Sequence, residues 1–278
     1  MSAYAYVAPT SIREVLTLLD DHVRTGRGTQ ILAGGTDVMV QMRGIKREPR
    51  TIIDIKRLEE TNRFQVGPEY IYIGSAIPSA RMQENAELKT LYPGLLEAAD
   101  LIGSTQVQGR ATICGNLCNA SPAGDSIPAL IAAGAVCDIA TPNGSRELAV
   151  EDFVIGVGRN ALADGEFLVG LKLRHPSAST QDAYLRFTPR TEMDIAVAGV
   201  GVSVTLEGSN CVAARVAIGA VATKSLLVTQ AADAVIGTAL DDSALQRAGE
   251  ACQAAAQPIS DKRGSAIYRR KVVAVLCR

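Results

Sequence analysis

The sequence predicts a mixed α+β protein with two domains, and three observations support this. The chain has 278 residues, enough for two modest hydrophobic cores. In the first part, short apolar runs alternate with segments of helical periodicity, as in an α/β unit. After Pro176, three strand patterns come first and Ala-rich helical patterns follow, the order of a separate α+β domain. We expect a first domain over residues 1–176, with subdomains of about 1–57 and 58–176, and a second over residues 177–278.

Composition narrows the possible partners and location. The formal net charge of −1 gives no electrostatic reason to expect nucleic acid or an anionic membrane. No run of eighteen apolar residues occurs, so we expect no membrane insertion. The segment Met1–Tyr6 lacks the basic and apolar regions of a secretory signal, which makes the cytoplasm the expected location.

The first subdomain is expected to run strand, helix, strand. Ser11 is a candidate helix N-cap, with Glu14 three residues later as in a capping box. The apolar face of that helix repeats at Ile12, Val15, Leu16 and Leu19. Strands are expected at 30–33 and 51–55, with a short helix at 38–42 between them.

The second subdomain repeats this mixture. Strands are expected at 71–74, 136–140 and 167–173, and helices at 78–91, 93–102 and 126–133. The stretch Gly103–Asp125 is rich in Gly, Ser, Thr, Asn and Gln but holds few charges. We expect a long polar loop there, and such loops inside compact domains are usually functional.

The C-terminal domain is expected to be a sheet followed by a run of helices. Strands are expected at 183–187, 195–206 and 212–221, with Glu207–Asn210 as the turn between the last two. Helices follow at about 229–237, 241–256 and 265–277.

Cysteine and histidine usage argues against disulfides and metal sites. The six cysteines are widely spaced in a long chain without a signal segment, so reduced thiols are expected. Cys114 and Cys118 form a lone C-x3-C pair, and His22 and His175 are the only histidines. Iron–sulfur and zinc sites need about four ligands, so we expect no metal on this chain.

Two glycine-containing segments stand out as candidate ligand loops. Each places glycines and small polar residues beside an apolar strand, and successive backbone N–H groups there form a concavity for anionic oxygens. A pyrophosphate needs such a cradle, but a simple tight turn explains either segment alone, and spacing does not name the ligand. The first segment is Leu32, Ala33, Gly34, Gly35, Thr36 and Asp37, and the second is Thr112, Ile113, Cys114, Gly115 and Asn116.

Other motifs are open to two interpretations or are excluded. Asp125 either caps the helix that follows or binds hydroxyls of a ribose or ribityl chain. Gly156–Ala161 satisfies the G-x-G-x-x-A dinucleotide fingerprint, but no amphipathic helix follows it, so we expect no Rossmann site. No phosphate-loop, nucleophile-elbow or Ser-His-Asp signature is present, and no catalytic residue is expected. A chain poor in acid–base groups but rich in ligand loops is typical of a protein whose bound cofactor supplies the chemistry.

These loops, taken together and in this order, resemble the FAD-binding medium subunit of the xanthine dehydrogenase and carbon monoxide dehydrogenase family, the molybdenum hydroxylases. The resemblance covers nearly the whole chain. Beyond the two loops it includes the segments Ser121–Asp125, Glu151–Phe153, Gly156–Arg159, Tyr184–Phe187, Met193–Ala196 and Tyr268–Lys271.

The resemblance implies a fold and a cofactor. It implies an FAD-binding unit of two α/β subdomains, of the vanillyl-alcohol-oxidase (PCMH) type, followed by a small α+β domain like the CO dehydrogenase flavoprotein C-terminal domain. It implies non-covalent FAD, with the pyrophosphate held by the two loops. Further cofactor-binding residues implied by the resemblance are Ser121, Asp125, Leu171, Arg186, Asp194 and Ile195, with Asp125 on cofactor hydroxyls, Arg186 near the flavin ring and Asp194 and Ile195 beside the isoalloxazine. The chain departs from the family at Cys114, where relatives commonly have glycine, and the thiol is either close to the cofactor or a passive small side chain.

The resemblance also implies an assembly. A large subunit would carry the molybdenum cofactor, a small subunit would carry [2Fe-2S] clusters, and the enzyme would be an oxidoreductase, expected as a dimer of heterotrimers. FAD on this chain would pass electrons to NAD+, oxygen or a quinone. Two alternatives stay open: a self-contained FAD-dependent oxidoreductase of the same fold, and a non-enzymatic scaffold that has lost FAD.

Overall fold

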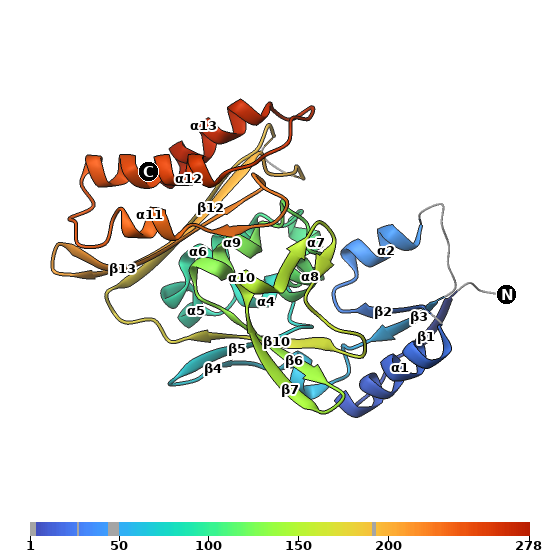
Figure 1. Ribbon diagram of the computed structural model, residues 1–278. Helices are drawn as coiled ribbons and strands as arrows, with labels where there is room; N and C mark the ends of the chain where they lie inside the picture. The colour runs from blue at the N-terminus through green and yellow to red at the C-terminus, as the bar shows by residue number, and fades with distance from the viewer. Residues whose placement is uncertain (1–3, 27, 44–49, 191–192) are drawn as a thin grey trace.

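The computed structural model describes residues 4–26, 28–43, 50–190 and 193–278. The expectation that Met1–Tyr6 carries no secretory signal therefore falls partly on residues 1–3, which lie outside the described residues. The described chain stacks in layers (Figure 1): a sheet at the bottom, a layer of helices, a second sheet, and a final pair of long helices at the top. A small unit, blue in Figure 1, lies beside the lower layers.

The small N-terminal unit is a parallel three-stranded sheet with two helices. Its strands are β1 (Tyr4–Val7), β2 (Gly28–Leu32) and β3 (Arg50–Asp54), in the order β1-β3-β2, and its helices are α1 (Ile12–Thr25) and α2 (Thr36–Met42). As the sequence predicts, Ser11 Oγ accepts a hydrogen bond from the Glu14 backbone N–H (3.3 Å) and caps α1. The Glu14 carboxylate reaches the backbone N–H of Thr10 (2.8 Å), one residue before the position expected in a capping box. Val15 of α1 packs with Phe167 of the neighbouring sheet in one core.

The central sheet has five antiparallel strands in the order β4-β5-β10-β6-β7. The strands are β4 (Phe64–Val66), β5 (Tyr70–Gly74), β6 (Val136–Thr141), β7 (Gly144–Ala149) and β10 (Phe167–Arg174). The helices of this region are α3 (Glu59–Asn62), α4 (Ser79–Gln83), α5 (Ala86–Leu91), α6 (Pro93–Asp100), α7 (Thr105–Gln108), α8 (Ile113–Asn119), α9 (Ser126–Ala132) and α10 (Val150–Phe153). Strands β8 (Val154–Gly156) and β9 (Arg159–Asn160) form a separate hairpin.

Two expectations for this region are wrong. The helix expected over 78–91 is split, because Asn85 Oδ1 accepts the backbone N–H of Leu88 (2.7 Å) and starts a new helix there. The long loop expected over 103–125 contains α7 and α8. Thr112 caps α8 through its hydroxyl, and Ile113, Cys114 and Leu117 bury its inner side, so a helix forms despite the polar composition.

The C-terminal part is a four-stranded antiparallel sheet with helices on one face. It comprises β11 (Thr180–Phe187), β12 (Ala198–Glu207), β13 (Asn210–Gly219) and β14 (Leu226–Leu227), with α11 (Thr229–Asp233), α12 (Asp242–Ala255) and α13 (Ala266–Cys277). The expected turn joins β12 to β13, where Gly208 adopts a positive φ of 61°.

Helix α9 is sandwiched between the two sheets. On one side its residues join the core of the central sheet. On the other, glycines of β12 and β13 allow close approach, since a Cβ on Gly201 would lie 2.7 Å from the carbonyl oxygen of Pro128. Helix α9 therefore packs against both sheets.

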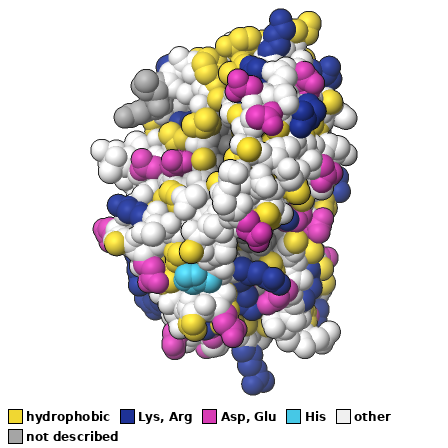
Figure 2. Space-filling model, turned by 90° about the vertical axis from the view of Figure 1, so that its left-hand side faces the viewer, with side chains coloured by type: hydrophobic (Ala, Val, Ile, Leu, Met, Phe, Trp, Pro, Cys, Tyr) yellow, Lys and Arg dark blue, Asp and Glu magenta, His cyan; other side chains and the backbone are white. Residues whose placement is uncertain are grey.

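Figure 2 shows one face of the molecule, on which acidic and basic side chains are interspersed. Among the described residues, no helix is long and apolar enough to cross a membrane.

Candidate cofactor site

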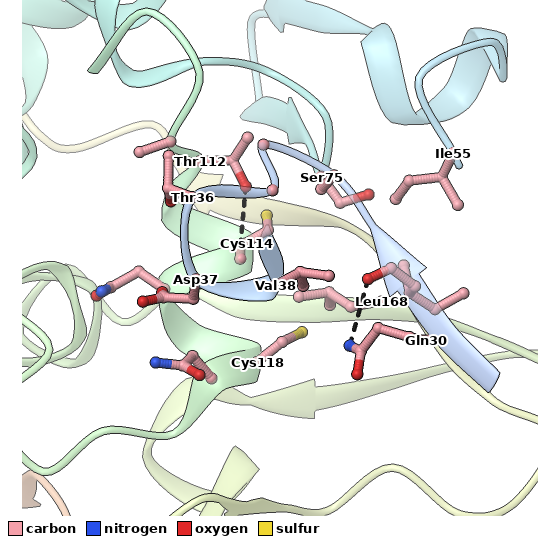
Figure 3. A pocket seen from close by; sticks show the side chains of 18 of the residues that line it. Gln30, Thr36, Asp37, Val38, Ile55, Ser75, Thr112, Cys114, Cys118 and Leu168 are labelled. Carbon is pink, nitrogen blue, oxygen red and sulfur yellow. Dashed lines mark hydrogen bonds between the residues drawn. The ribbon is translucent and has the colours of Figure 1, made fainter. Parts of the chain in front are cut away.

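A cavity of about 440 Å³ lies where the N-terminal unit meets the central sheet and its helices. This is within the usual range for small-molecule sites, about 300–1,000 Å³. Its lining includes β2 with the Ala33–Val38 segment, both ends of α8, the β8–β9 hairpin and β10. Figure 3 shows Thr36 and Asp37 from the first part close to Cys114 and Cys118 of α8.

The first glycine segment is held in place from behind. Gly35 has a φ of +82°, a conformation that L side chains rarely adopt. Lys56 Nζ donates to the carbonyl oxygen of Ala33 (3.1 Å) and pairs with Asp54 (2.7 Å). The Tyr6 hydroxyl donates to the other oxygen of Asp54 (2.7 Å). The loop is thus fixed by the Lys56–Asp54 ion pair and the hydrogen bond from Lys56 to Ala33.

The two predicted glycine segments meet in space. A Cβ on Gly34 would collide with the backbone carbonyl of Arg110, so only glycine allows this approach. The second segment is the beginning of α8, where the Gly115 N–H donates to Thr112 Oγ1 (2.9 Å), as the dashed line in Figure 3 marks. The segments 33–37 and 112–116, far apart in sequence, form one wall.

The thiols on this wall are neutral. Cys114 is buried and Cys118 half-buried, and both line the cavity. Burial raises the pKa of the Cys118 thiol to about 12 and holds the pKa of Cys114 well above its usual value. Neither thiol is therefore a thiolate nucleophile at neutral pH.

Residues that the sequence did not single out also line the cavity. Gly158 belongs to the rejected dinucleotide fingerprint. Its segment forms the β8–β9 hairpin, with no helix after it, and so is not a Rossmann element, but its tip reaches the cavity. Asn160 holds the hairpin by donating to the Cys118 carbonyl oxygen (3.0 Å). Ser75, which follows β5, also lines the cavity.

Asp125 and Arg186 lie together away from the cavity wall. Arg186 Nη1 donates to Asp125 Oδ2 (2.7 Å) and to the carbonyl oxygen of Leu101 (3.1 Å). The Tyr184 hydroxyl donates to Asp125 Oδ1 (2.9 Å). The expectation that Asp125 caps α9 is wrong, because its side chain makes no capping hydrogen bond. The next residue after Leu101, Ile102, does line the cavity.

The remaining site residues are placed as follows. Leu171 and Ile113 are fully buried in the core of the central sheet. Ser121 Oγ accepts the Ala123 N–H in the turn before α9. Asp194 pairs with Arg190 (3.5 Å) and Arg263 (3.3 Å), and Ile195 is half exposed. Of the predicted residues, the cavity wall contains Ala33, Gly34, Gly35, Thr36, Asp37, Thr112, Cys114, Gly115 and Asn116, whereas Leu32, Ile113, Ser121, Asp125, Leu171, Arg186, Asp194 and Ile195 lie outside it.

The donor set of the cavity indicates what it can hold. Among the described residues that line it there is no Lys, Arg or His, and Asp37 is the only carboxylate. Hydroxyls, amides and backbone N–H groups therefore provide the polar contacts, and Phe167, Leu168 and Leu162 provide apolar ones. A ligand with a phosphate group and planar apolar rings, such as FAD, fits this lining. Across the described residues, no group of three or more His, Cys, Asp or Glu side chains is placed to hold a metal ion.

Comparison with known proteins agrees with this geometry. Residues 2–175 match the family model described as the FAD binding domain in molybdopterin dehydrogenase, and residues 183–278 match the CO dehydrogenase flavoprotein C-terminal domain. The carbon monoxide dehydrogenase medium chain of Afipia carboxidovorans is 29% identical over 277 residues, with 99% of this chain and 94% of the relative covered. The nicotinate dehydrogenase FAD-subunit of Eubacterium barkeri is 26% identical, with 98% and 93% covered.

Solved structures show the same likeness. A carbon monoxide dehydrogenase structure from Hydrogenophaga pseudoflava superposes with a TM-score of 0.92 at 29% identity, covering 99% of this chain and 94% of the matched one. Carbon monoxide dehydrogenase from Oligotropha carboxidovorans gives 0.93 at 28% identity, covering 100% and 96%.

Proposed function

This chain belongs to the FAD-binding medium subunits of the molybdenum hydroxylases, and from this membership we propose that it holds one FAD and relays electrons within a multi-subunit oxidoreductase. The observation that supports the proposal most directly is the cavity wall formed by Ala33–Asp37 and Thr112–Asn116. These two segments, predicted from sequence as ligand loops, share one wall without any basic side chain.

We propose that the FAD diphosphate binds at this wall. Glycines 34 and 35 keep the backbone open, and the hydroxyls of Thr36 and Thr112 lie beside them. Because the described residues of this wall include no Lys, Arg or His, N–H groups and hydroxyls would offset the phosphate charge. Cys114 lines the same wall as a neutral side chain and leaves the charge balance unchanged.

Bound flavin supplies the electron chemistry, accepting electrons and passing them on. The chain's own residues bind and orient it. We infer no proton transfer from a side chain here, because Asp37 is the only carboxylate on the described wall and both thiols stay protonated. Binding of cofactor hydroxyls by Asp125, and contacts of Leu171, Arg186, Asp194 and Ile195 with the flavin, stay predictions from the family resemblance.

We further propose the assembly implied by that resemblance. Partners would be a large subunit with the molybdenum cofactor and a small subunit with [2Fe-2S] clusters, in a dimer of heterotrimers, with NAD+, oxygen or a quinone as acceptor. The carbon monoxide dehydrogenase and nicotinate dehydrogenase relatives carry names of medium chain and FAD-subunit, which supports a subunit role. The domain division at residue 176 and the cytoplasmic location also stay predictions.

Replacing Gly35 tests the cofactor site. Gly35→Val places a branched side chain at φ +82°, where its Cβ would lie 2.8 Å from Leu32 Cδ1, so the loop must change shape. The wild-type chain should release intact FAD on acid precipitation, because binding is non-covalent. Gly35→Val should retain less than about a tenth of the flavin. Several contacts to the cofactor are lost, and each loss of about 1.4 kcal/mol in binding free energy weakens the affinity for FAD tenfold.

Gly208→Val is the matched control. Gly208 also has a positive φ (61°), but nothing lies within 4 Å of its ideal Cβ and it sits in the β12–β13 turn. It should lose stability yet keep its flavin. Release of FMN alone from the wild type, or full FAD occupancy in Gly35→Val, contradicts the proposal.

A further inference from the structure

Ser75 lines the cavity, and its hydroxyl has no hydrogen-bond partner among the described residues. This oxygen is buried, and the residue as a whole is only 3% exposed. The backbone N–H of Ser75 is already used, donating to the carbonyl oxygen of Val169 (2.9 Å). Buried hydroxyls are rarely left unpaired because desolvation without a replacement bond is costly. A ligand in the cavity is the available partner.

The position of this hydroxyl is fixed by the fold. Ser75 follows the last residue of β5, Gly74, whose N–H donates to the carbonyl oxygen of Arg63 (2.8 Å). A Cβ on Gly74 would collide with the backbone carbonyl of Thr61. The turn is thus tightly packed against α3, and Ser75 sits on a rigid support rather than on a free loop.

A short chain of hydrogen bonds connects Ala76, the residue after Ser75, to Leu32 at the start of the first glycine segment. The Ile55 N–H donates to the carbonyl oxygen of Leu32 (3.1 Å), and Thr61 Oγ1 donates to that of Ile55 (2.6 Å). The Ala76 N–H then donates to the carbonyl oxygen of Thr61 (2.9 Å). Figure 3 shows Ser75 and Ile55 on the same side of the cavity. The backbone next to Ser75 is therefore tied to the start of the first glycine segment.

The charge of the cavity indicates what the hydroxyl meets. The described wall has no basic side chain, so an anionic group there must be held by neutral donors. An aliphatic hydroxyl donates one hydrogen bond readily to a phosphate oxygen. We propose that Ser75 Oγ donates a hydrogen bond to a diphosphate oxygen of bound FAD. This inference rests on the proposed function and adds to it a cofactor-binding residue outside the two glycine segments.

Ser75→Ala in the full chain tests the proposal. The flavin-free chain is titrated with FAD, ADP and riboflavin, and binding is followed by flavin fluorescence or by calorimetry. The variant should bind FAD and ADP roughly ten- to hundredfold more weakly, as expected for a lost hydrogen bond to a charged group. Riboflavin has no diphosphate, so its binding should stay unchanged.

Ser225→Ala is a matched control. Ser225 is also 3% exposed and its hydroxyl is also unpartnered, but it lies outside the cavity, just before β14. Without ligand, both variants should melt at or above the wild-type temperature, because each removes an unpaired buried hydroxyl. Ser225→Ala should bind FAD like the wild type.

The outcomes separate this inference from the proposed function. A Ser75→Ala chain that binds FAD as tightly as the wild type, or loses riboflavin as strongly as ADP, overturns the assignment while leaving FAD binding intact. A wild-type chain that binds neither FAD nor ADP overturns the proposed function itself.

Discussion

The buried pair of Asp125 and Arg186 connects the C-terminal sheet to the rim of the cofactor cavity. Their side chains are only 11% and 5% exposed. Arg186 comes from β11, whereas Asp125 precedes α9 and Leu101, the second acceptor of Arg186, follows α6. Burial raises the pKa of Asp125, while the neighbouring Arg186 acts in the opposite direction. The pair holds Leu101, and with it the adjoining cavity residue Ile102, in place.

We expect strong coupling between these two residues. Asp125→Ala leaves a buried guanidinium unpaired and should cost about 3–5 kcal/mol of stability. Adding Arg186→Met removes that stranded charge, so the double variant should be more stable than the sum of the single losses predicts. Thermal or denaturant unfolding of the four proteins measures the coupling. Strictly additive losses are incompatible with the pair described here.

At the residue scale, local sequence patterns predict the two glycine segments. They do not predict roles that depend on contacts between residues far apart in the chain. Gly34, Gly35 and Gly115 stand out because two glycine-containing segments with small polar residues occur in one chain, although a tight turn explains either one alone. Neither role that the sequence offers for Asp125, a helix cap or a ligand of cofactor hydroxyls, includes its pairing with Arg186, because the two residues lie 61 positions apart in the chain. Ser75 carries no motif at all; only its unpaired, buried hydroxyl on the cavity wall marks it.

At the element scale, strand β11 docks on the beginning of helix α6 through Asp182. Its two carboxylate oxygens accept the N–H groups of Gly94 (3.1 Å) and Leu95 (3.0 Å). A Cβ on Gly94 would lie 2.5 Å from the Ala183 nitrogen, so strand and helix are in close contact. Burial raises the pKa of Asp182 to about 6, and the negative charge of Glu97 adds to the rise, against the two N–H groups.

This shift predicts a pH dependence of stability. Since the folded pKa lies above the unfolded one, the folded chain binds more protons between about pH 4 and pH 6. The contribution of Asp182 to the unfolding free energy therefore falls as pH rises through this window, by at most about 3 kcal/mol for two pKa units. Asp182→Asn removes this titrating carboxyl group. Between about pH 4 and pH 6, the unfolding free energy of the variant should therefore fall less steeply with rising pH, or rise more steeply, than that of the wild type.

Asp241→Asn is the control with the opposite sign. Asp241 caps α12, and its hydrogen bonds to Ser243 and Ala244 lower its pKa. Its contribution is lost as pH falls through the folded pKa, so the variant should be less sensitive to acid below about pH 4. Melting curves from pH 3 to pH 7 measure both. An unchanged slope between pH 4 and pH 6 in Asp182→Asn contradicts the assignment.

Most helices and strands are predicted by the periodicity of apolar residues. The elements that the sequence does not predict lack such periodicity. Strands such as β5 and β10 and the capped helix α1 have patterns that match their burial. The sequence predicts a loop over helix α8 because its Gly, Asn and Cys residues form helices poorly. The Thr112 cap and the buried inner side stabilise the helix instead. Strand β7, at the edge of its sheet and largely exposed, has no apolar alternation to reveal it.

At the scale of the whole molecule, the layered packing forms a cavity that can hold a cofactor. The described residues of the cavity wall include no catalytic acid–base pair. The family to which the chain belongs consists of flavoprotein subunits of multi-subunit dehydrogenases. The scarcity of histidines and of nucleophile motifs, together with the ligand loops, predicts that a bound cofactor supplies the chemistry. The division among subunits is implied by the family resemblance. The sequence leaves the acceptor and the substrate open.

The central claim is that this chain carries electrons for partner subunits. Stopped-flow absorbance of its flavin tests this directly, with the isolated full chain compared with its co-purified complex, using aldehydes, purines and N-heterocycles as reductants. The lone chain should be reduced by dithionite but by none of these substrates, whereas the complex should show substrate-dependent bleaching of the flavin band. Rapid substrate-dependent reduction of the lone chain, free of molybdenum and iron, would contradict the account and favour a self-contained FAD oxidoreductase.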